Sequence, residues 1–374
     1  MDKKKRILIS CGGTGGHVFP GLATAQVLQQ CGHTPELWIS GRRSVETETL
    51  RGWNGPIFRT GARPLTPVNL PAFLVTLWRV WRTMRRARPD VVLAMGCYSS
   101  VAPVLVARWL GIPVVLHEAN AVPGKAVVFL ARFARVTALS FAASAAHLPS
   151  RRTAVTGMPV RTELAGQLPM EGPAPANGGA GGSALSGSTT APKAAFTVLI
   201  TGGSLGAHTV NELVCETLLD LHRRGAGIRA IHQCGPAEEA ALRTRYTVAG
   251  ADVQVHAFLR EMGRAYASAD IAICRAGAAT CFELCLCGVP AILIPLPTAV
   301  RGHQRLNAEA LVQSGGALLR LQPELTPATL ATDIEALRSD PARRAAMRQA
   351  LRQLACPDAA AKLADLTLET ASQQ

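Results

Sequence analysis

Short apolar runs rich in β-branched residues alternate with longer stretches of helical composition along most of the chain. In the first half these runs predict strands at 7–10, 36–40, 91–94, 114–118 and 135–139. In the second half they predict strands at 197–200, 228–233, 253–256, 271–274, 291–295 and 317–319. Strands that alternate with helices are typical of parallel sheets covered on both faces. The pattern therefore predicts an α/β protein with two open sheets.

The two series of strands are separated by a segment at 169–195 in which Gly, Pro, Ala, Ser and Thr leave few side chains that can pack. We expect a flexible linker there, without catalytic residues. A length of 374 residues also favours two domains. The predicted organisation is a first domain at 1–168, a second domain at 196–345 and a helical tail at 346–374. One arrangement has the tail packing back on the first domain, but the sequence does not indicate which domain it covers.

A formal net charge of +14 means that the surface attracts phosphates, nucleic acid or an anionic membrane, and charge alone does not choose among them. The apolar run after the basic start, 7–9, is too short for a signal peptide, and no run of 18 apolar residues predicts a membrane span. Ten cysteines without an export signal are expected to be free thiols. The tightest group, Cys281, Cys285 and Cys287, lacks metal-site spacing, which favours buried packing.

A glycine-rich turn, 12–16, follows the first strand and is succeeded by His17 and a helical stretch. Glycines let backbone N–H groups approach a ligand at a helix N-terminus, where negative charge is favoured, so a diphosphate or a polar sugar fits this turn. The dinucleotide fingerprint is absent, and the second strand leads into Arg42 and Arg43 rather than an acidic ribose ligand. His17 is a candidate site residue; the alternative is a histidine that only caps the turn.

A second glycine-rich turn, 202–206, follows the first strand of the second series and leads into a helix that carries Asn211. Two such turns, one in each half, predict a ligand held between the carboxyl ends of two sheets. The alternative is that both are tight turns which need glycine only for their geometry.

Polar residues also gather after other predicted strands. His117, Glu118 and Asn120 end one strand, where hydrogen bonding or acid–base chemistry is plausible, although Glu118 alternatively caps the next helix. Arg275 and Glu283 follow a strand of the second series, and Gln304 and Asn307 follow the next. Carboxylates and amides there suit ribose and sugar hydroxyls. The alternatives are a surface ion pair for Arg275 and a solvated position for Glu283.

The order of these motifs resembles the bacterial peptidoglycan N-acetylglucosaminyltransferases, over nearly the whole chain except the linker. The matching segments are Gly12–Pro20, His117–Asn120, Gly202–Ala207, Cys274–Ala278 and His303–Ala308. The resemblance implies two Rossmann-like domains that face each other across a cleft, the GT-B type of glycosyltransferase. It also implies inverting transfer of N-acetylglucosamine from UDP-N-acetylglucosamine to the muramoyl 4-hydroxyl of undecaprenyl-diphospho-N-acetylmuramoyl-pentapeptide, in cell-wall synthesis.

The resemblance further implies roles for individual residues. Two candidates for the catalytic base are His17 and Glu118, and the sequence does not decide between them. Acceptor binding is expected from Thr14, Gly15, Gly16, Tyr98, His117 and Asn120. Donor binding is expected from Thr14, Gly15, Gly16, Asn120, Arg161, Ser204, Asn211, Arg275, Glu283, Gln304 and Asn307. Neither a metal, a cofactor nor a nucleic-acid partner is implied.

Four residues depart from the family's usual motifs, mostly on the acceptor side: Cys97, Ala119, Val127 and Met158. They leave two rival functions open. One is a related transferase with a different acceptor, and the other is a nucleotide-sugar-binding protein with an eroded active site.

Residues 70–88 combine an apolar stripe with arginines, and the stripe comprises Phe73, Leu74, Leu77, Trp78 and Trp81. A basic, tryptophan-bearing helix is suited to lie on anionic lipid. Together with the lipid-linked acceptor that the resemblance implies, this favours peripheral attachment to the cytoplasmic face of the inner membrane. The alternative is a helix whose stripe covers the first sheet.

Overall fold

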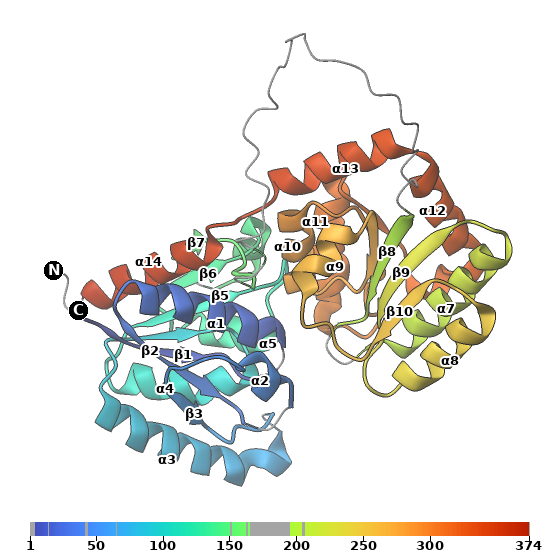
Figure 1. Ribbon diagram of the computed structural model, residues 1–374. Helices are drawn as coiled ribbons and strands as arrows, with labels where there is room; N and C mark the ends of the chain where they lie inside the picture. Colours follow the sequence, from blue (N-terminus) through green and yellow to red (C-terminus); the bar gives the residue numbers. More distant parts are fainter. Residues whose placement is uncertain are drawn as a thin grey trace, which may run out of the picture.

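The computed structural model describes residues 4–13, 15–41, 44–64, 66–149, 152–161, 164, 195–203 and 206–373. The linker expected at 169–195 lies outside the described residues, apart from Ala195. The described chain forms two α/β domains, each organised around one parallel sheet (Figure 1).

In the described part of the chain, the first sheet has seven parallel strands in the order β3-β2-β1-β4-β5-β6-β7. Its strands are β1 (Arg6–Ser10), β2 (Thr34–Ile39), β3 (Ile57–Arg59), β4 (Val91–Ala94), β5 (Val114–Glu118), β6 (Val136–Leu139) and β7 (Thr153–Val155). The helices between them are α1 (Gly15–Gln30), α2 (Ser44–Thr49), α3 (Leu70–Ala87), α4 (Val101–Trp109) and α5 (Lys125–Leu130). In the central pair, Ile7 lies opposite Val91 and Ser10 opposite Ala94.

The second sheet has six described strands in the order β10-β9-β8-β11-β12-β13. They are β8 (Phe196–Thr201), β9 (Ile228–Gln233), β10 (Val253–His256), β11 (Ile271–Cys274), β12 (Ala291–Leu293) and β13 (Ala317–Leu319). The helices that accompany them are α7 (His208–Arg223), α8 (Glu239–Ala249), α9 (Met262–Ser268), α10 (Ala278–Cys287), α11 (His303–Gln313), α12 (Pro327–Ser339), α13 (Pro341–Gln353) and α14 (Ala359–Ser372).

Helices cover both faces of the first sheet, which explains why its central strands are apolar at nearly every position. Side chains of α1 and α14 pack in one core, where Leu28 and Leu363 are fully buried. Side chains of α3, α4 and α5 form a second core on the opposite face. The C-terminal tail therefore crosses between domains, since α13 packs on α10 of the second domain and α14 packs on α1 of the first (Figure 1).

The prediction of two parallel sheets is confirmed. Two strands, β3 and β7, were not predicted because each has three residues, lies at a sheet edge and contains no fully buried residue. Such strands produce no continuous apolar run. All ten cysteines are free thiols, and Cys281 and Cys285 lie in the core of the second domain.

Candidate active site

The loops that follow β5 and β11 meet between the two domains. Asn307, near the start of α11, is fully buried. Its Nδ2 donates to Asn120 Oδ1 at 3.1 Å and to the Ala276 carbonyl at 3.2 Å, and its Oδ1 accepts from the Ala121 N–H at 2.9 Å. The carboxyl ends of the two sheets therefore face each other, as expected for a ligand bound between them.

His17 lies at the start of α1, and its Nδ1 is 2.8 Å from the Met95 carbonyl oxygen. A carbonyl oxygen only accepts, so in the neutral ring Nδ1 carries the proton and Nε2 keeps a free lone pair. Burial lowers the pKa of His17 from 6.5, the hydrogen bond to Met95 opposes this, and the charge of His303 in the second domain lowers the pKa further. His17 is therefore a neutral imidazole at pH 7, able to accept a proton at Nε2.

The first glycine-rich loop is held by a carboxylate that the sequence did not single out. Glu46 is fully buried, and it accepts from the Gly13 N–H at 2.6 Å, the Ser40 hydroxyl at 2.6 Å and the Gly41 N–H at 2.7 Å. Burial acts to raise the pKa of Glu46, but these donors outweigh it and the pKa is lowered. Gly13 has a φ of +107°, and a Cβ there would lie 3.1 Å from the ring of Tyr98. Tyr98 therefore lines this loop, whereas Thr14 lies outside the described residues.

Glu118 organises the loop after β5. One oxygen accepts from the Asn120 N–H at 2.7 Å and from Asn120 Nδ2 at 3.1 Å, and the other accepts from the Gly124 N–H at 3.1 Å, at the start of α5. Burial raises the pKa of Glu118 to about 7, against the opposing effect of these donors. The carboxylate thus shapes the acceptor-side loop and caps the next helix.

His117 points into the first domain. Its Nε2 is 3.2 Å from the Ser140 hydroxyl and 3.4 Å from the Gly157 carbonyl, and its buried Nδ1 has no hydrogen-bond partner among the described residues. Burial lowers the pKa of His117 to about 4. This side chain is a neutral packing residue beneath the loop, not a group exposed to ligand.

On the second domain, Glu283 in α10 is almost fully buried and paired with Arg161. Arg161 Nε donates to Glu283 Oε1 at 3.2 Å, and the Tyr266 hydroxyl donates to Oε2 at 3.1 Å. The Arg161 guanidinium also lies 4.0 Å from the ring centroid of Phe19 in α1. The carboxylate is therefore paired with a guanidinium that also contacts α1 of the first domain.

Arg275 and Gln304 hold the loop after β12. Arg275 donates to the carbonyls of Ile294 and Pro295, each at 3.1 Å, and to Gln322 Oε1 at 2.7 Å. It is buried and its described partners are neutral oxygens, so the alternative of a surface ion pair is wrong. Gln304 Oε1 accepts from the Leu296 N–H at 2.9 Å, which fixes the orientation of its amide.

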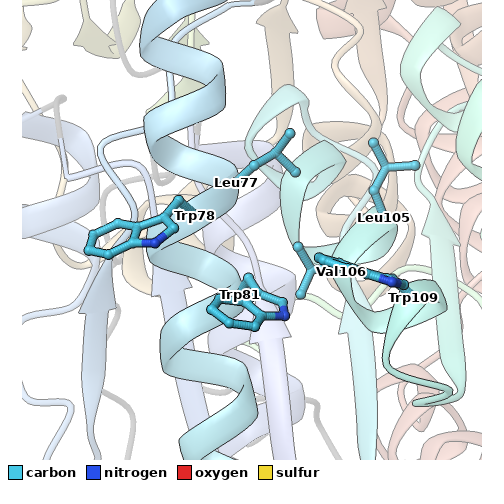
Figure 2. A pocket seen from close by; sticks show the side chains of 6 residues that line it. All are labelled: Leu77, Trp78, Trp81, Leu105, Val106 and Trp109. Carbon is cyan, nitrogen blue, oxygen red and sulfur yellow. The ribbon is translucent and has the colours of Figure 1, made fainter.

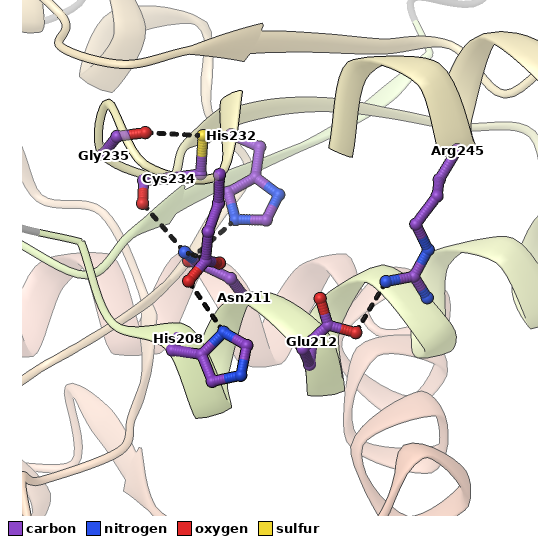
Figure 3. Close-up of polar contacts among 8 residues, drawn as sticks. His208, Asn211, Glu212, His232, Cys234, Gly235 and Arg245 are labelled. Carbon is purple, nitrogen blue, oxygen red and sulfur yellow. Dashed lines mark hydrogen bonds and ion pairs between the residues drawn. The ribbon is translucent and has the colours of Figure 1, made fainter. Parts of the chain in front are cut away.

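Asn211 belongs to a buried polar network, part of which Figure 3 shows. Its Nδ2 donates to the Cys234 carbonyl and to Glu238 Oε2, each at 2.8 Å, and its Oδ1 is 3.2 Å from His232 Nε2. The described hydrogen bonds of the Asn211 side chain therefore all lie within the second domain. Ser204 lies outside the described residues.

The same network brings three potential metal ligands together, namely His208, Glu212 and Glu238, with ligand atoms within 4.8 Å of one another. Both carboxylates already have protein partners. Glu212 accepts from Arg245 at 2.6 Å, and Glu238 lies 2.7 Å from His208 Nδ1 as well as contacting Asn211. These contacts account for the cluster without an ion.

The four departures from the family motifs, Cys97, Ala119, Val127 and Met158, are all buried. Val127 packs behind the loop, where a Cβ on Gly96 would lie 2.8 Å from its Cγ2. The departures therefore alter packing inside the protein and not its solvent-exposed surface.

Helix α3 has two faces. Val80 and Met84 are fully buried against the first sheet, and Phe73, Leu77 and Trp81 are half-buried beside them, whereas Leu74 and Trp78 are exposed. Trp109 of α4, which the sequence did not single out, stacks on Trp81 with centroids 6.1 Å apart. The two helices enclose an apolar groove of about 460 Å³, shown in Figure 2, lined by Leu77, Trp78, Trp81, Leu105, Val106 and Trp109.

Arginines border this groove. Arg82 lies 5.6 Å from the ring centroid of Trp78, and Arg85 lies 5.3 Å from that of Trp81. One face of α3 therefore covers the first sheet, as the alternative interpretation expected. The other face is exposed and carries both apolar side chains and arginines, which that alternative does not explain. Of the helices that the structure describes, none is long and apolar enough to cross a bilayer.

Comparison with protein families gives two matches that together cover most of the chain. Residues 7–139 match the glycosyltransferase family 28 N-terminal domain, and residues 197–363 match the glycosyltransferase family 28 C-terminal domain.

Two similar proteins share the name UDP-N-acetylglucosamine--N-acetylmuramyl-(pentapeptide) pyrophosphoryl-undecaprenol N-acetylglucosamine transferase. The one from Aeromonas hydrophila is 38% identical over 369 residues, 96% of this chain and 96% of its own. The one from Xanthomonas axonopodis pv. citri is 37% identical over 372 residues, 98% of this chain and 82% of its own.

Among solved structures, Acinetobacter baumannii MurG superposes with a TM-score of 0.74 at 32% identity, over 98% of this chain and 100% of that one. The kitacinnamycin glycotransferase superposes with a TM-score of 0.68 at 19% identity, over 99% and 100% of the two chains, and shares the fold.

Proposed function

Because this chain belongs to glycosyltransferase family 28, we propose that it transfers N-acetylglucosamine from UDP-N-acetylglucosamine to undecaprenyl-diphospho-N-acetylmuramoyl-pentapeptide. The attacking group is the 4-hydroxyl of the muramoyl sugar, and the product is the disaccharide lipid from which peptidoglycan is built. The observation that carries the proposal is the contact between the strand-end loops of the two domains, in a chain similar over nearly its full length to such transferases.

The first domain, 1–168, takes the acceptor and the second, 196–345, takes the donor, while the tail at 346–374 links them through α14. On the donor side, Glu283 accepts hydrogen bonds from the ribose hydroxyls, which requires it to share or release its contact with Arg161. Gln304 contacts the sugar. The diphosphate lies at the second glycine-rich loop, where the N-terminus of α7 and the buried charge of Arg275 favour an anion.

His17 is the proposed base, in preference to Glu118. Among the described residues no hydrogen bond is made to its Nε2, whereas both oxygens of Glu118 already accept hydrogen bonds from the loop after β5. In the reaction, the muramoyl oxygen forms a bond to the anomeric carbon while the bond to the diphosphate oxygen breaks. The hydroxyl proton passes to His17 Nε2, and UDP leaves with the electron pair from the opposite face, which inverts the anomeric configuration.

The lipid-linked acceptor also requires contact with a membrane. We place the exposed face of α3 and Trp109 of α4 against anionic lipid at the cytoplasmic face of the inner membrane, where arginines meet the headgroups. The protein attaches peripherally, and the acceptor's headgroup is reached without extraction from the leaflet.

The test is transfer of radiolabelled N-acetylglucosamine from its UDP donor to a short-chain muramoyl lipid analogue. A labelled disaccharide lipid supports the proposal. Donor turnover with other acceptors, but not this one, would favour a related transferase. Donor binding without turnover would favour an eroded site.

A further inference from the structure

A cavity of about 200 Å³ lies where the two domains and the C-terminal tail meet. Its walls come from the segment 140–142 after β6 of the first domain, from α10 and α11 of the second domain, and from the segment between α13 and α14. We call it the junction cavity. None of the described residues that line it is assigned above to the donor, the acceptor or the membrane. The junction cavity is therefore separate from the candidate active site.

The walls of the junction cavity are apolar and partly aromatic. Phe141 of the first domain and Phe282 of α10 both line it, and their rings meet edge to face with centroids 4.9 Å apart. Leu354, which also lines it, is 38% exposed. An apolar cavity of roughly 150 Å³ in another protein stays dry and binds benzene. The junction cavity is somewhat larger, so its volume suits one molecule with two fused aromatic rings.

The few polar atoms of these walls give no site for a charged ligand. The hydroxyl of Ser140 already lies 3.2 Å from Nε2 of His117. Burial raises the pKa of the thiols of Cys281, Cys285 and Cys356, to about 12 for Cys285, so all three are neutral at pH 7. A neutral cysteine behaves as a small apolar residue. A charged molecule would lose its hydration here without finding a partner, and an uncharged aromatic molecule would not.

The junction cavity lies beside the point where the chain crosses from the second domain to the first. Cys356 packs so closely on Gly157 of the first domain that a Cβ on Gly157 would lie 2.6 Å from the Cβ of Cys356. In another wall, Phe282 directly precedes Glu283, whose carboxylate is paired with Arg161. A ligand in the cavity contacts both domains and therefore favours the domain arrangement in which this cavity exists.

We propose that the junction cavity binds a small uncharged aromatic molecule, of about the size of indole, and that its occupation weakens donor binding. In the arrangement that the ligand favours, Glu283 is paired with Arg161, and the donor ribose requires that contact to be shared or released. The two effects are reciprocal, so the donor weakens ligand binding by the same factor. The effect on the donor rests on the proposed function, whereas ligand binding itself does not.

Binding is tested with 5-fluoroindole, observed by fluorine NMR in the presence of the full-length protein. We expect a dissociation constant of about 1 mM or tighter for a ligand of about ten non-hydrogen atoms. Ala142→Phe and Ala310→Leu each add side-chain atoms to a wall of the cavity, one from each domain, and each should weaken binding at least about tenfold. Absence of binding to the wild type, or unchanged affinity in both variants, would overturn the proposal.

Two controls locate the bound molecule. Ala143→Phe makes the same substitution at the next residue, which is exposed and does not line the cavity. The groove between α3 and α4 is a competing apolar site, which Trp78→Ser with Trp109→Ser disrupts. Both controls should bind 5-fluoroindole as the wild type does, and thermal unfolding establishes that every variant is folded. Loss of binding in the tryptophan variant but not in Ala142→Phe would place the ligand in the groove and overturn the proposal.

The effect on the donor is measured by calorimetric titration of UDP-N-acetylglucosamine with and without saturating 5-fluoroindole. The donor dissociation constant should rise at least about fivefold in the wild type and stay unchanged in Ala142→Phe. An unchanged value in the wild type would overturn the proposed effect on donor binding. If the protein binds no donor at all, the proposed function fails, and fluorine NMR still decides whether the cavity is a ligand site.

Discussion

Membrane attachment through α3 and α4 gives a prediction whose size follows from the structure. The two tryptophans to change are Trp78, which is 56% exposed, and Trp109, which is 74% exposed. Trp81 is a poor choice, although it lies in the same apolar stripe, because it is half-buried against the first domain and its loss would also disturb packing. The perturbation is therefore Trp78→Ser with Trp109→Ser.

A tryptophan side chain offers up to about 250 Å² of surface, so at these exposures the pair leaves roughly 300 Å² in water. If half of that area enters the lipid, the gain at 25 cal/mol per Å² is about 4 kcal/mol, or about a thousandfold in partitioning. Each arginine near the surface adds about 1 kcal/mol on anionic lipid. The double variant should therefore lose nearly all binding at high salt, where the arginine contribution is screened.

Co-sedimentation with anionic vesicles at low and high salt measures the effect, and thermal unfolding establishes that the variant is folded. Val248→Ser is the control, since Val248 is a similarly exposed apolar residue on α8 of the second domain. Sedimentation of Trp78→Ser/Trp109→Ser at the wild-type level would refute the assignment, as would an equal loss in Val248→Ser.

Three further predictions concern the site. His17→Ala should lower kcat by about 100- to 10,000-fold with donor affinity unchanged, and wild-type kcat should fall as the pH drops through the pKa of His17, which lies below 6.5; turnover within a few-fold of wild type would make His17 a structural turn residue. Glu283→Ala should weaken donor binding by about 1.5–3 kcal/mol in calorimetry, and an unchanged dissociation constant in the folded variant would remove Glu283 from the ribose site. Because burial raises the pKa of Glu118 from 4.5 to about 7, its contribution to the free energy of unfolding is fully present below pH 4.5 and is lost as the pH rises to 7. Denaturant titrations at pH 5 and 7.5 should show that Glu118→Gln reduces the pH dependence of stability, and an identical pH dependence would contradict this reasoning.

The strands that could be predicted from the sequence are those whose burial requires an apolar residue at nearly every position. Central strands such as β1 and β4 are covered on both faces, so nearly every position is apolar and the run is visible. Edge strands β3 and β7 left no such signal. Their pairing depends on neighbouring strands that contact them only in the folded chain.

The site was predictable as a set of loops but not as a set of contacts. Strand-end motifs indicated which segments follow the strands toward the other domain, and His17, Glu283 and Asn307 lie on such segments. Their partners come from remote parts of the chain, so the sequence could not indicate that Asn307 is satisfied by Asn120 and Ala276. Glu46 was missed for the same reason, because an acidic residue in a short helix has no distinctive pattern until the glycine-rich loop folds over it.

The central claim is tested most directly by one transfer reaction with the full-length protein. Radiolabelled UDP-N-acetylglucosamine and a short-chain muramoyl-pentapeptide lipid analogue are incubated together, and the lipid product and released UDP are quantified. We predict one UDP released for each labelled disaccharide lipid formed, with the anomeric configuration inverted and with formation abolished when the muramoyl 4-hydroxyl is blocked. Donor that binds without transfer, or label that appears on the blocked analogue, would contradict the account.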